Sequence, residues 1–133
     1  AYLAACRDRY RAESAAIRER HNRGESGADV VRDLAAAADA ILAGAYRFAL
    51  RGAPNRRALE SRTALCALGS YGRGELSPHS DIDVCLLHAG AFDDDMERLN
   101  AFLVPFLWDV GFNVGYAVRS VRETCDLTRD DLK

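Results

Sequence analysis

Two aspartates, Asp81 and Asp83, stand directly after a glycine-rich stretch and directly before an apolar run. Successive side chains of a β-strand alternate between its two faces, so we expect both carboxylates on one face, with α-carbons roughly 7 Å apart. Ile82 and Val84 then point to the other face, into a core. Two like charges at this spacing repel unless a cation lies between them. Mg²⁺ suits this pair, because it takes oxygen ligands and is commonly held by one or two carboxylates plus substrate phosphates.

The glycine-rich stretch supplies groups that suit a phosphate. Gly69 lets the backbone approach a ligand closely, and N–H groups in such a turn form an anion-binding concavity. Ser70 adds a hydroxyl donor, and the guanidinium of Arg73 matches the geometry of a phosphate. Together with the aspartates, these residues predict a nucleoside triphosphate on the turn and its metal on the carboxylates. The alternative is structural: the aspartate pair only caps a strand and binds water.

Composition excludes some classes of partner. The chain has 133 residues and a formal net charge of −2, whereas a dedicated nucleic-acid binder is usually strongly basic. It contains no run of about 18 apolar residues, so no membrane span is expected. The early charges of the first 21 residues are not those of a signal peptide, and we expect the chain to be a fragment of a longer protein.

The four cysteines indicate a reduced protein. None lies in a C-x-x-C pair or near a histidine at a zinc-site spacing. Cys66 and Cys85 fall inside apolar runs, so we expect them to be buried core thiols. This usage favours a cytoplasmic location.

The first part of the chain has the pattern of two helices. Apolar residues recur at helical spacing over 2–22 and again over 28–50, with a short glycine-containing turn between them. We expect an antiparallel helical hairpin. The segment 51–57, RGAPNRR, is expected to be a loop, and it divides the chain into a hairpin domain (1–57) and a second domain (58–133).

The second part alternates short apolar runs with helical patterns. Strands are expected at 63–69, 81–88 and 112–120, and helices at 93–110 and 122–133, with one helical turn at 71–76. Pro105 should kink or interrupt the helix over 93–110. The order predicts an α/β (α+β) fold, with a short mixed β-sheet and the helical hairpin packed on it.

The string GSYGRGELSPHSDIDVCLL (69–87) resembles the signature of the DNA polymerase β-type nucleotidyltransferase superfamily. Within it, the chain resembles the nucleotidyltransferase domain of the bacterial protein-PII uridylyltransferase/uridylyl-removing enzymes. The segment LVPFLWDVGFNVGYAVRSVRETCDL (103–127) resembles the stretch that comes after the motif in that family. A lone D-x-D is a weak signal, whereas the full string is a strong one.

The resemblance implies a specific reaction. Members of that family transfer UMP from UTP to a tyrosine of the PII nitrogen-regulatory protein and release pyrophosphate. By position, Asp81 and Asp83 are the catalytic metal ligands for Mg²⁺, while Gly69, Ser70 and Arg73 hold the nucleotide. The implied partners are UTP and PII, with no nucleic acid and no membrane. The family also carries a hydrolase domain and ligand-sensing domains, whose patterns are absent from this sequence.

Some positions depart from the family. The third strand contains no acid, and Asn113 stands where a third carboxylate could serve; Asp131 is the best match for an acidic position later in the family. Tyr116 replaces a histidine that is usual there, and Arg119 either contacts phosphate or pairs with an acid. These departures keep two alternatives open: a related nucleotidyltransferase with another acceptor, and a degenerate domain that binds nucleotide or a partner without turnover.

Overall fold

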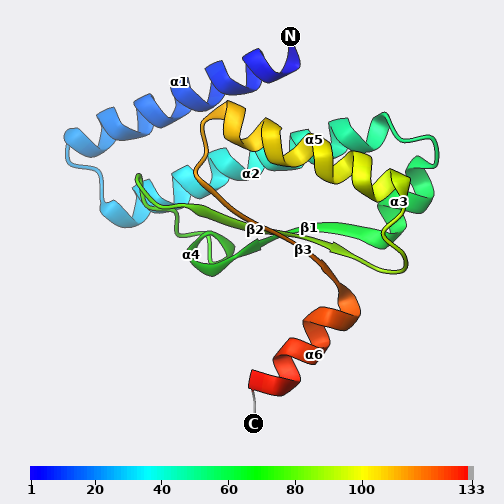
Figure 1. The fold of residues 1–133 in the computed structure, drawn as a ribbon. Coiled ribbons are helices and arrows are strands. Elements are labelled where there is room, and N and C mark those ends of the chain that lie inside the picture. Colours follow the sequence, from blue (N-terminus) through cyan, green and yellow to red (C-terminus); the bar gives the residue numbers. More distant parts are fainter. Residues whose placement is uncertain (132–133) are drawn as a thin grey trace.

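The computed structural model describes residues 1–131, which form six helices and a three-stranded sheet (Figure 1). In chain order the elements are α1 (Tyr2–Asn22), α2 (Gly27–Arg51), α3 (Arg56–Arg62), β1 (Thr63–Leu68), α4 (Gly69–Gly72), β2 (Ile82–His88), α5 (Asp94–Val110), β3 (Val114–Ser120) and α6 (Val121–Asp131).

The sheet has the strand order β1-β2-β3 and is mixed. β1 pairs with β2 in the antiparallel sense, and β2 pairs with β3 in the parallel sense. Ile82, Val84 and Leu86 of β2 are at most 1% exposed. They alternate with residues of the opposite face, as a half-covered strand requires. The expected α+β fold with a short mixed sheet is confirmed.

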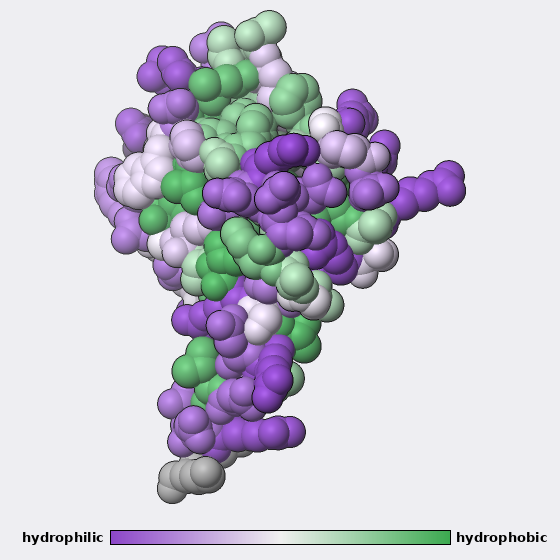
Figure 2. Space-filling view, turned by 45° about the vertical axis from the view of Figure 1, so that its right-hand side comes forward, coloured by the Kyte–Doolittle hydropathy of each residue, from purple (hydrophilic) through white to green (hydrophobic). Residues whose placement is uncertain are grey.

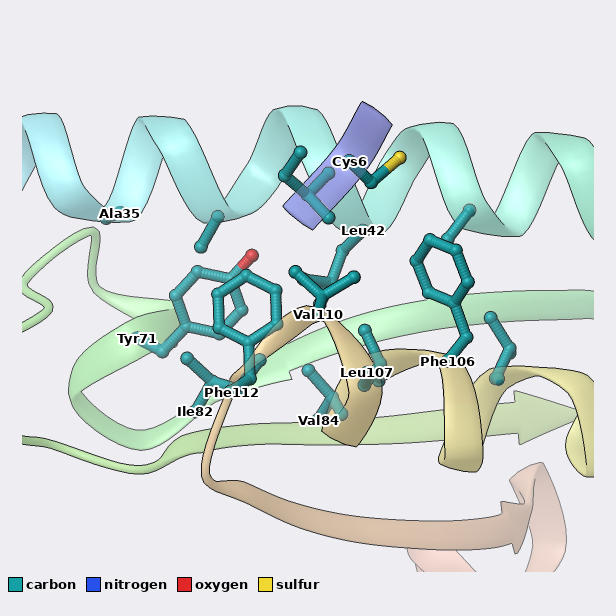
Figure 3. Close-up of a cluster of buried hydrophobic side chains, with 14 of the residues drawn as sticks. Cys6, Ala35, Leu42, Tyr71, Ile82, Val84, Phe106, Leu107, Val110 and Phe112 are labelled. Atoms are coloured by element: carbon teal, nitrogen blue, oxygen red, sulfur yellow. The ribbon is translucent and has the colours of Figure 1, made fainter. Parts of the chain in front are cut away.

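Three helices, α1, α2 and α5, lie on one face of the sheet (Figure 1). Ser26 caps the start of α2, where its side chain accepts a hydrogen bond from the backbone N–H of Asp29. Buried side chains of the helical pair, of α5 and of β2 join in one hydrophobic cluster (Figure 3). The domain division at residues 57 and 58 stays a prediction.

Helix α3 was not expected, and the predicted loop over 51–57 is correct only in part. The chain leaves α2 at Gly52 and re-enters a helix at Arg56. The N–H of Leu59 bonds to the carbonyl of Asn55 at 3.0 Å, and the Leu59 side chain is 1% exposed. Burial of this single apolar residue fixes the short helix against the core. The surrounding sequence is rich in arginine, so it shows no helical pattern of apolar residues. The short helical turn also begins earlier than expected, at Gly69.

Pro105 does not interrupt α5, so the interruption expected from the sequence is wrong, while the expected kink stays a prediction. The helix runs continuously from Asp94 to Val110 with Pro105 inside it. Pro105 and Ala101 are both exposed. The carbonyl that loses its partner at Pro105 therefore lies on the side of the helix where water can reach it, while Phe106 and Leu107 pack into the core.

The expectation of two buried core thiols is correct for Cys85 and wrong for Cys66. Cys66 of β1 and Cys85 of β2 lie opposite each other in the strand register, on the sheet face away from the helices, and both thiols are free. Cys85 is 5% exposed, whereas Cys66 is half-buried. The apolar runs alone did not reveal which face each residue takes. Conversely, His88, which appeared incidental in the sequence, is buried at 8% exposure and packs edge-on against Phe92.

The C-terminal helix α6 is confirmed over Val121–Asp131, and its last two expected residues lie outside the described part of the chain. It projects from the body of the molecule, with hydrophobic surface among its charged residues (Figure 2). Val121 and Leu127 are 45% and 49% exposed. Within residues 1–131, no helix has the length and apolar character needed to cross a membrane.

Candidate functional site

The two aspartates of the D-x-D motif lie at the start of the central strand. Asp83 is the second residue of β2, and Asp81 directly precedes the strand. Both side chains are exposed. Since Ile82 and Val84 face the helices, Asp83 points from the opposite, open face of the sheet. Ile82 donates its N–H to the carbonyl of Asn113 at 2.8 Å, which fixes the chain between the two aspartates to the start of β3.

Two glycines border the carboxylate of Asp83. Its partners in the sheet are Leu68 at the end of β1 and Gly115 in β3. A Cβ on Gly69 would lie 3.1 Å from Oδ2 of Asp83, and Gly69 has a φ of +58° that favours glycine. A Cβ on Gly115 would collide with Oδ1 of the same carboxylate. The absence of both side chains gives the Asp83 carboxylate the room that it occupies.

The turn α4 carries Ser70, and Arg73 directly follows the turn. Gly69 leads from β1 directly into the turn, so Ser70 follows the position that borders Asp83. Arg73 pairs with Glu75 at 3.5 Å, and both side chains are well exposed, at 66% and 59%. An exposed pair of this kind is weak, so the guanidinium is available to a stronger anion. A Cβ on Gly72 would lie 2.8 Å from the carbonyl oxygen of Ala67, so the turn sits tightly on the end of β1.

The loop before the motif forms one wall of a small cavity of about 160 Å³. Ser77, His79, Ser80 and Asn113 line it together with apolar residues of the core. Ser80 donates its N–H to the carbonyl of Ser77 at 3.0 Å, which shapes the turn into the strand. His79 is exposed in this loop.

Among residues 1–131, the structure does not group a third carboxylate with the pair. Within residues 1–131, no group of three or more histidine, cysteine, aspartate or glutamate side chains is placed to hold a metal ion. Asn113 is exposed at the edge of the cavity, and Asp131 is exposed in the last turn of α6.

Two family positions on β3 lie on opposite faces of the sheet. Tyr116 pairs with Val84, so it faces the helices and packs against the core. Burial raises the pKa of its phenol. Arg119 pairs with Leu87 on the open face, four residues beyond Gly115, which places it about 13 Å along the strand from the Asp83 level. The replacement of the family's usual histidine by Tyr116 therefore falls on the face of the sheet that packs against the helices, opposite the face of Asp83.

The available donors suit Mg²⁺. They are two exposed carboxylates, hard oxygen donors that the cation prefers, and Gly69 and Gly115 leave room for the carboxylate of Asp83. A site of two carboxylates leaves further positions of an octahedral cation to water and to substrate phosphates, which is the usual arrangement for Mg²⁺ bound with a nucleotide.

Sequence reasoning missed Gly115 and the anchor of the turn. A glycine inside a strand signals close approach of another group, and this signal was available. The anchor is the hydrogen bond from the Tyr71 hydroxyl to Oδ1 of Asp39, at 2.6 Å. It joins residues 32 positions apart, and no local pattern reveals it.

Comparison with protein families gives the class of this chain. Residues 11–117 match the family described as "Putative nucleotidyltransferase DUF294". The matched range includes the turn, both aspartates and Gly115. The chain belongs to this family of nucleotidyltransferases.

Its curated relatives carry a more specific name. The chain is 37% identical over 116 residues to the bifunctional uridylyltransferase/uridylyl-removing enzyme of Nitrosococcus oceani, and 35% identical over 130 residues to that of Methylococcus capsulatus. These alignments cover 87% and 97% of the chain but only 12% and 14% of the relatives. The enzyme of Caulobacter vibrioides is 34% identical over 116 residues, 86% of the chain and 12% of that enzyme. No solved structure matches the chain significantly.

Proposed function

We propose that the chain is the nucleotidyltransferase part of an enzyme that transfers UMP from UTP to a tyrosine of the PII protein. The observation that carries the proposal is the carboxylate of Asp83 on the open sheet face, bordered by Gly69 and Gly115 and adjoining the turn with Ser70. The similarity to uridylyltransferases supports UTP as the donor. PII as the acceptor rests on the resemblance of the motif string. The same resemblance and the free thiols support a cytoplasmic location.

The reaction forms one bond and breaks one. The tyrosine oxygen attacks the α-phosphorus of UTP, the bond from that phosphorus to the bridging oxygen breaks, and pyrophosphate leaves with the bonding electrons. The phenolic proton passes to water or to a base. When bound, Mg²⁺ supplies charge neutralisation for the triphosphate and the leaving pyrophosphate.

The residues of this chain have positioning roles. Asp81 and Asp83 would hold the cation through their carboxylates. The Ser70 hydroxyl and the Arg73 guanidinium would bind phosphate oxygens, with Arg73 exchanging Glu75 for the stronger anion. Gly69 and Gly115 leave the room that the Asp83 carboxylate takes up beside the turn. Such positioning and charge stabilisation provide most of the catalysis in phosphoryl transfer.

One observation favours a second candidate, a domain that binds nucleotide without turnover. Within the described residues, no third carboxylate is grouped with Asp81 and Asp83. A general base or a further metal ligand would then have to come from outside this group of residues. The residues that select the acceptor would have to come from outside it as well.

The test is a transfer assay. The chain is incubated with UTP labelled at the α-phosphate, Mg²⁺ and purified PII, and the PII is analysed by mass spectrometry for uridylyl-tyrosine. Label on a PII tyrosine that disappears with Asp83→Asn supports the proposal. Tight Mg²⁺-dependent UTP binding without any label transfer favours the second candidate, and label on a different acceptor identifies a related transferase.

A further inference from the structure

The turn that carries Ser70 is anchored to helix α2 by a buried tyrosine. Tyr71 directly follows Ser70 and is only 4% exposed. Its ring lies in the core cluster beneath α2, with the hydroxyl oxygen directed toward that helix (Figure 3). The hydroxyl donates a hydrogen bond of 2.6 Å to Oδ1 of Asp39. This length is typical of a charge-assisted bond to an ionised carboxylate.

Within residues 1–131, Asp39 forms no salt bridge. No cation in this part of the chain therefore competes with the Tyr71 hydroxyl for the Asp39 carboxylate. Burial and the bond to Asp39 both raise the pKa of Tyr71, with burial the larger cause. The phenol therefore keeps its proton and remains a donor at any physiological pH.

A second contact fixes the other end of the same segment. The N–H of Leu76 donates to the carbonyl of Val31 at 3.1 Å, and Leu76 is 3% exposed. Val31 and Asp39 are eight residues apart on α2, about 12 Å along the helix. The segment from Gly69 to Leu76, which includes Ser70 and Arg73, is thus attached to one rigid helix at two points.

We propose that Asp39 is a positioning residue for the nucleotide-binding turn, acting through Tyr71 to fix the place of Ser70 relative to Asp83. This inference rests on the proposed function and adds a residue of the N-terminal helices to the site. Asp39 lies on the surface of α2, where an aspartate has no packing role that would account for it. A merely structural role predicts that its loss lowers stability without changing nucleotide affinity.

The test compares Asp39→Ala, Asp39→Asn and Tyr71→Phe with Asp33→Ala in the 133-residue chain. Asp33 is the matched control, because it is a carboxylate on the same helix whose side chain pairs with Arg20 of α1. Two readouts are taken from each variant: the Kd for UTP with Mg²⁺ by calorimetry, and amide hydrogen exchange over residues 69–76.

Asp39→Ala and Tyr71→Phe are expected to raise the Kd about tenfold and to speed exchange in the turn. Asp39→Asn keeps an acceptor oxygen, so it should restore most of the affinity, and Asp33→Ala should leave both readouts unchanged. Wild-type Kd values in folded Asp39→Ala and Tyr71→Phe would overturn the inference. If the wild-type chain binds no UTP at all, the proposed function fails, and only hydrogen exchange then tests the anchor. Unchanged exchange over residues 69–76 in both variants would overturn the anchor, and faster exchange would support it.

Discussion

Asp83 and Gly115 lie opposite each other on the neighbouring parallel strands β2 and β3, and the carboxylate occupies the place where a side chain of residue 115 would begin. Gly115 has no positive φ, so its backbone conformation does not itself require glycine. Glycine is needed here for space alone. The orientation of the central carboxylate therefore depends on a residue of another strand.

Gly115→Ala should separate function from folding. The added Cβ meets only the end of the Asp83 side chain, which can rotate away, so we expect a loss of stability below about 1 kcal/mol. The displaced carboxylate should weaken Mg²⁺-dependent UTP binding by at least about tenfold. Calorimetric titration with UTP and Mg²⁺, together with thermal unfolding, measures both effects.

Two variants serve as controls for this change. Gly27→Ala adds a Cβ where nothing lies within 4 Å, so it tests the general effect of replacing a glycine. Tyr116→Phe alters the next residue of β3, on the opposite face of the sheet. Wild-type UTP affinity in Gly115→Ala would show that the position of Asp83 does not matter to the site.

Asp93 should make stability depend on pH in the acid range. Its carboxylate accepts two hydrogen bonds from Arg62, at 2.6 and 2.7 Å, and caps α5 through the N–H of Met96. These contacts, Arg62 first, lower the pKa of Asp93. A carboxyl whose folded pKa lies below its unfolded value stabilises the fold above about pH 4 and loses that contribution as the pH falls through the folded pKa.

Asp93→Asn tests this dependence, because asparagine also caps a helix but cannot form the ion pair. At pH 7 the variant should unfold about 3 to 5 °C below the wild type, and the gap should shrink as the pH falls from 5 to 2. Asp8→Asn, an exposed change on α1, should show no such trend. A gap for Asp93→Asn that stays constant over this range would contradict the assignment.

Pro105 should lower the free energy of unfolding, and replacing it with an ordinary helix residue should raise that free energy again. It lies inside a continuous helix on the exposed side, where its ring leaves one carbonyl without a helical partner. Pro105→Ala restores an N–H to the helix and should raise the free energy of unfolding by about 1 to 2 kcal/mol, measured by urea denaturation. Pro54→Ala, in the turn after α2, restores no helical hydrogen bond and should not stabilise the chain. Destabilisation by Pro105→Ala would mean that the proline fits the helix better than an ordinary residue.

The sequence predicted those parts of the fold that depend on local pattern. The helix over 2–22 and the face taken by Ile82 follow from hydrophobic periodicity, and both are confirmed. The roles of Asp81, Asp83 and the turn stay predictions. Helix α3 and the placement of Cys66 could not be predicted, because one depends on the burial of a single leucine and the other on which sheet face the helices cover.

The geometry of the site depends on contacts between distant segments. Gly115 borders Asp83 only because β3 lies parallel to β2 in one register. Asp39 meets Tyr71 only because the fold brings α2 within hydrogen-bonding distance of this tyrosine. Periodicity and turn residues define each segment, but they carry no information on which residues of two segments meet.

The most direct test of the central claim is calorimetric titration of the chain with UTP, with and without Mg²⁺, for the wild type and Asp83→Asn. Asparagine keeps the shape of the side chain and removes its charge, so the fold should be unaffected. We expect saturable binding that requires Mg²⁺ and that weakens at least about tenfold in Asp83→Asn. Binding of equal strength in the two proteins, or binding that does not depend on Mg²⁺, would contradict the assignment of Asp83 as a metal ligand in a nucleotidyltransferase site.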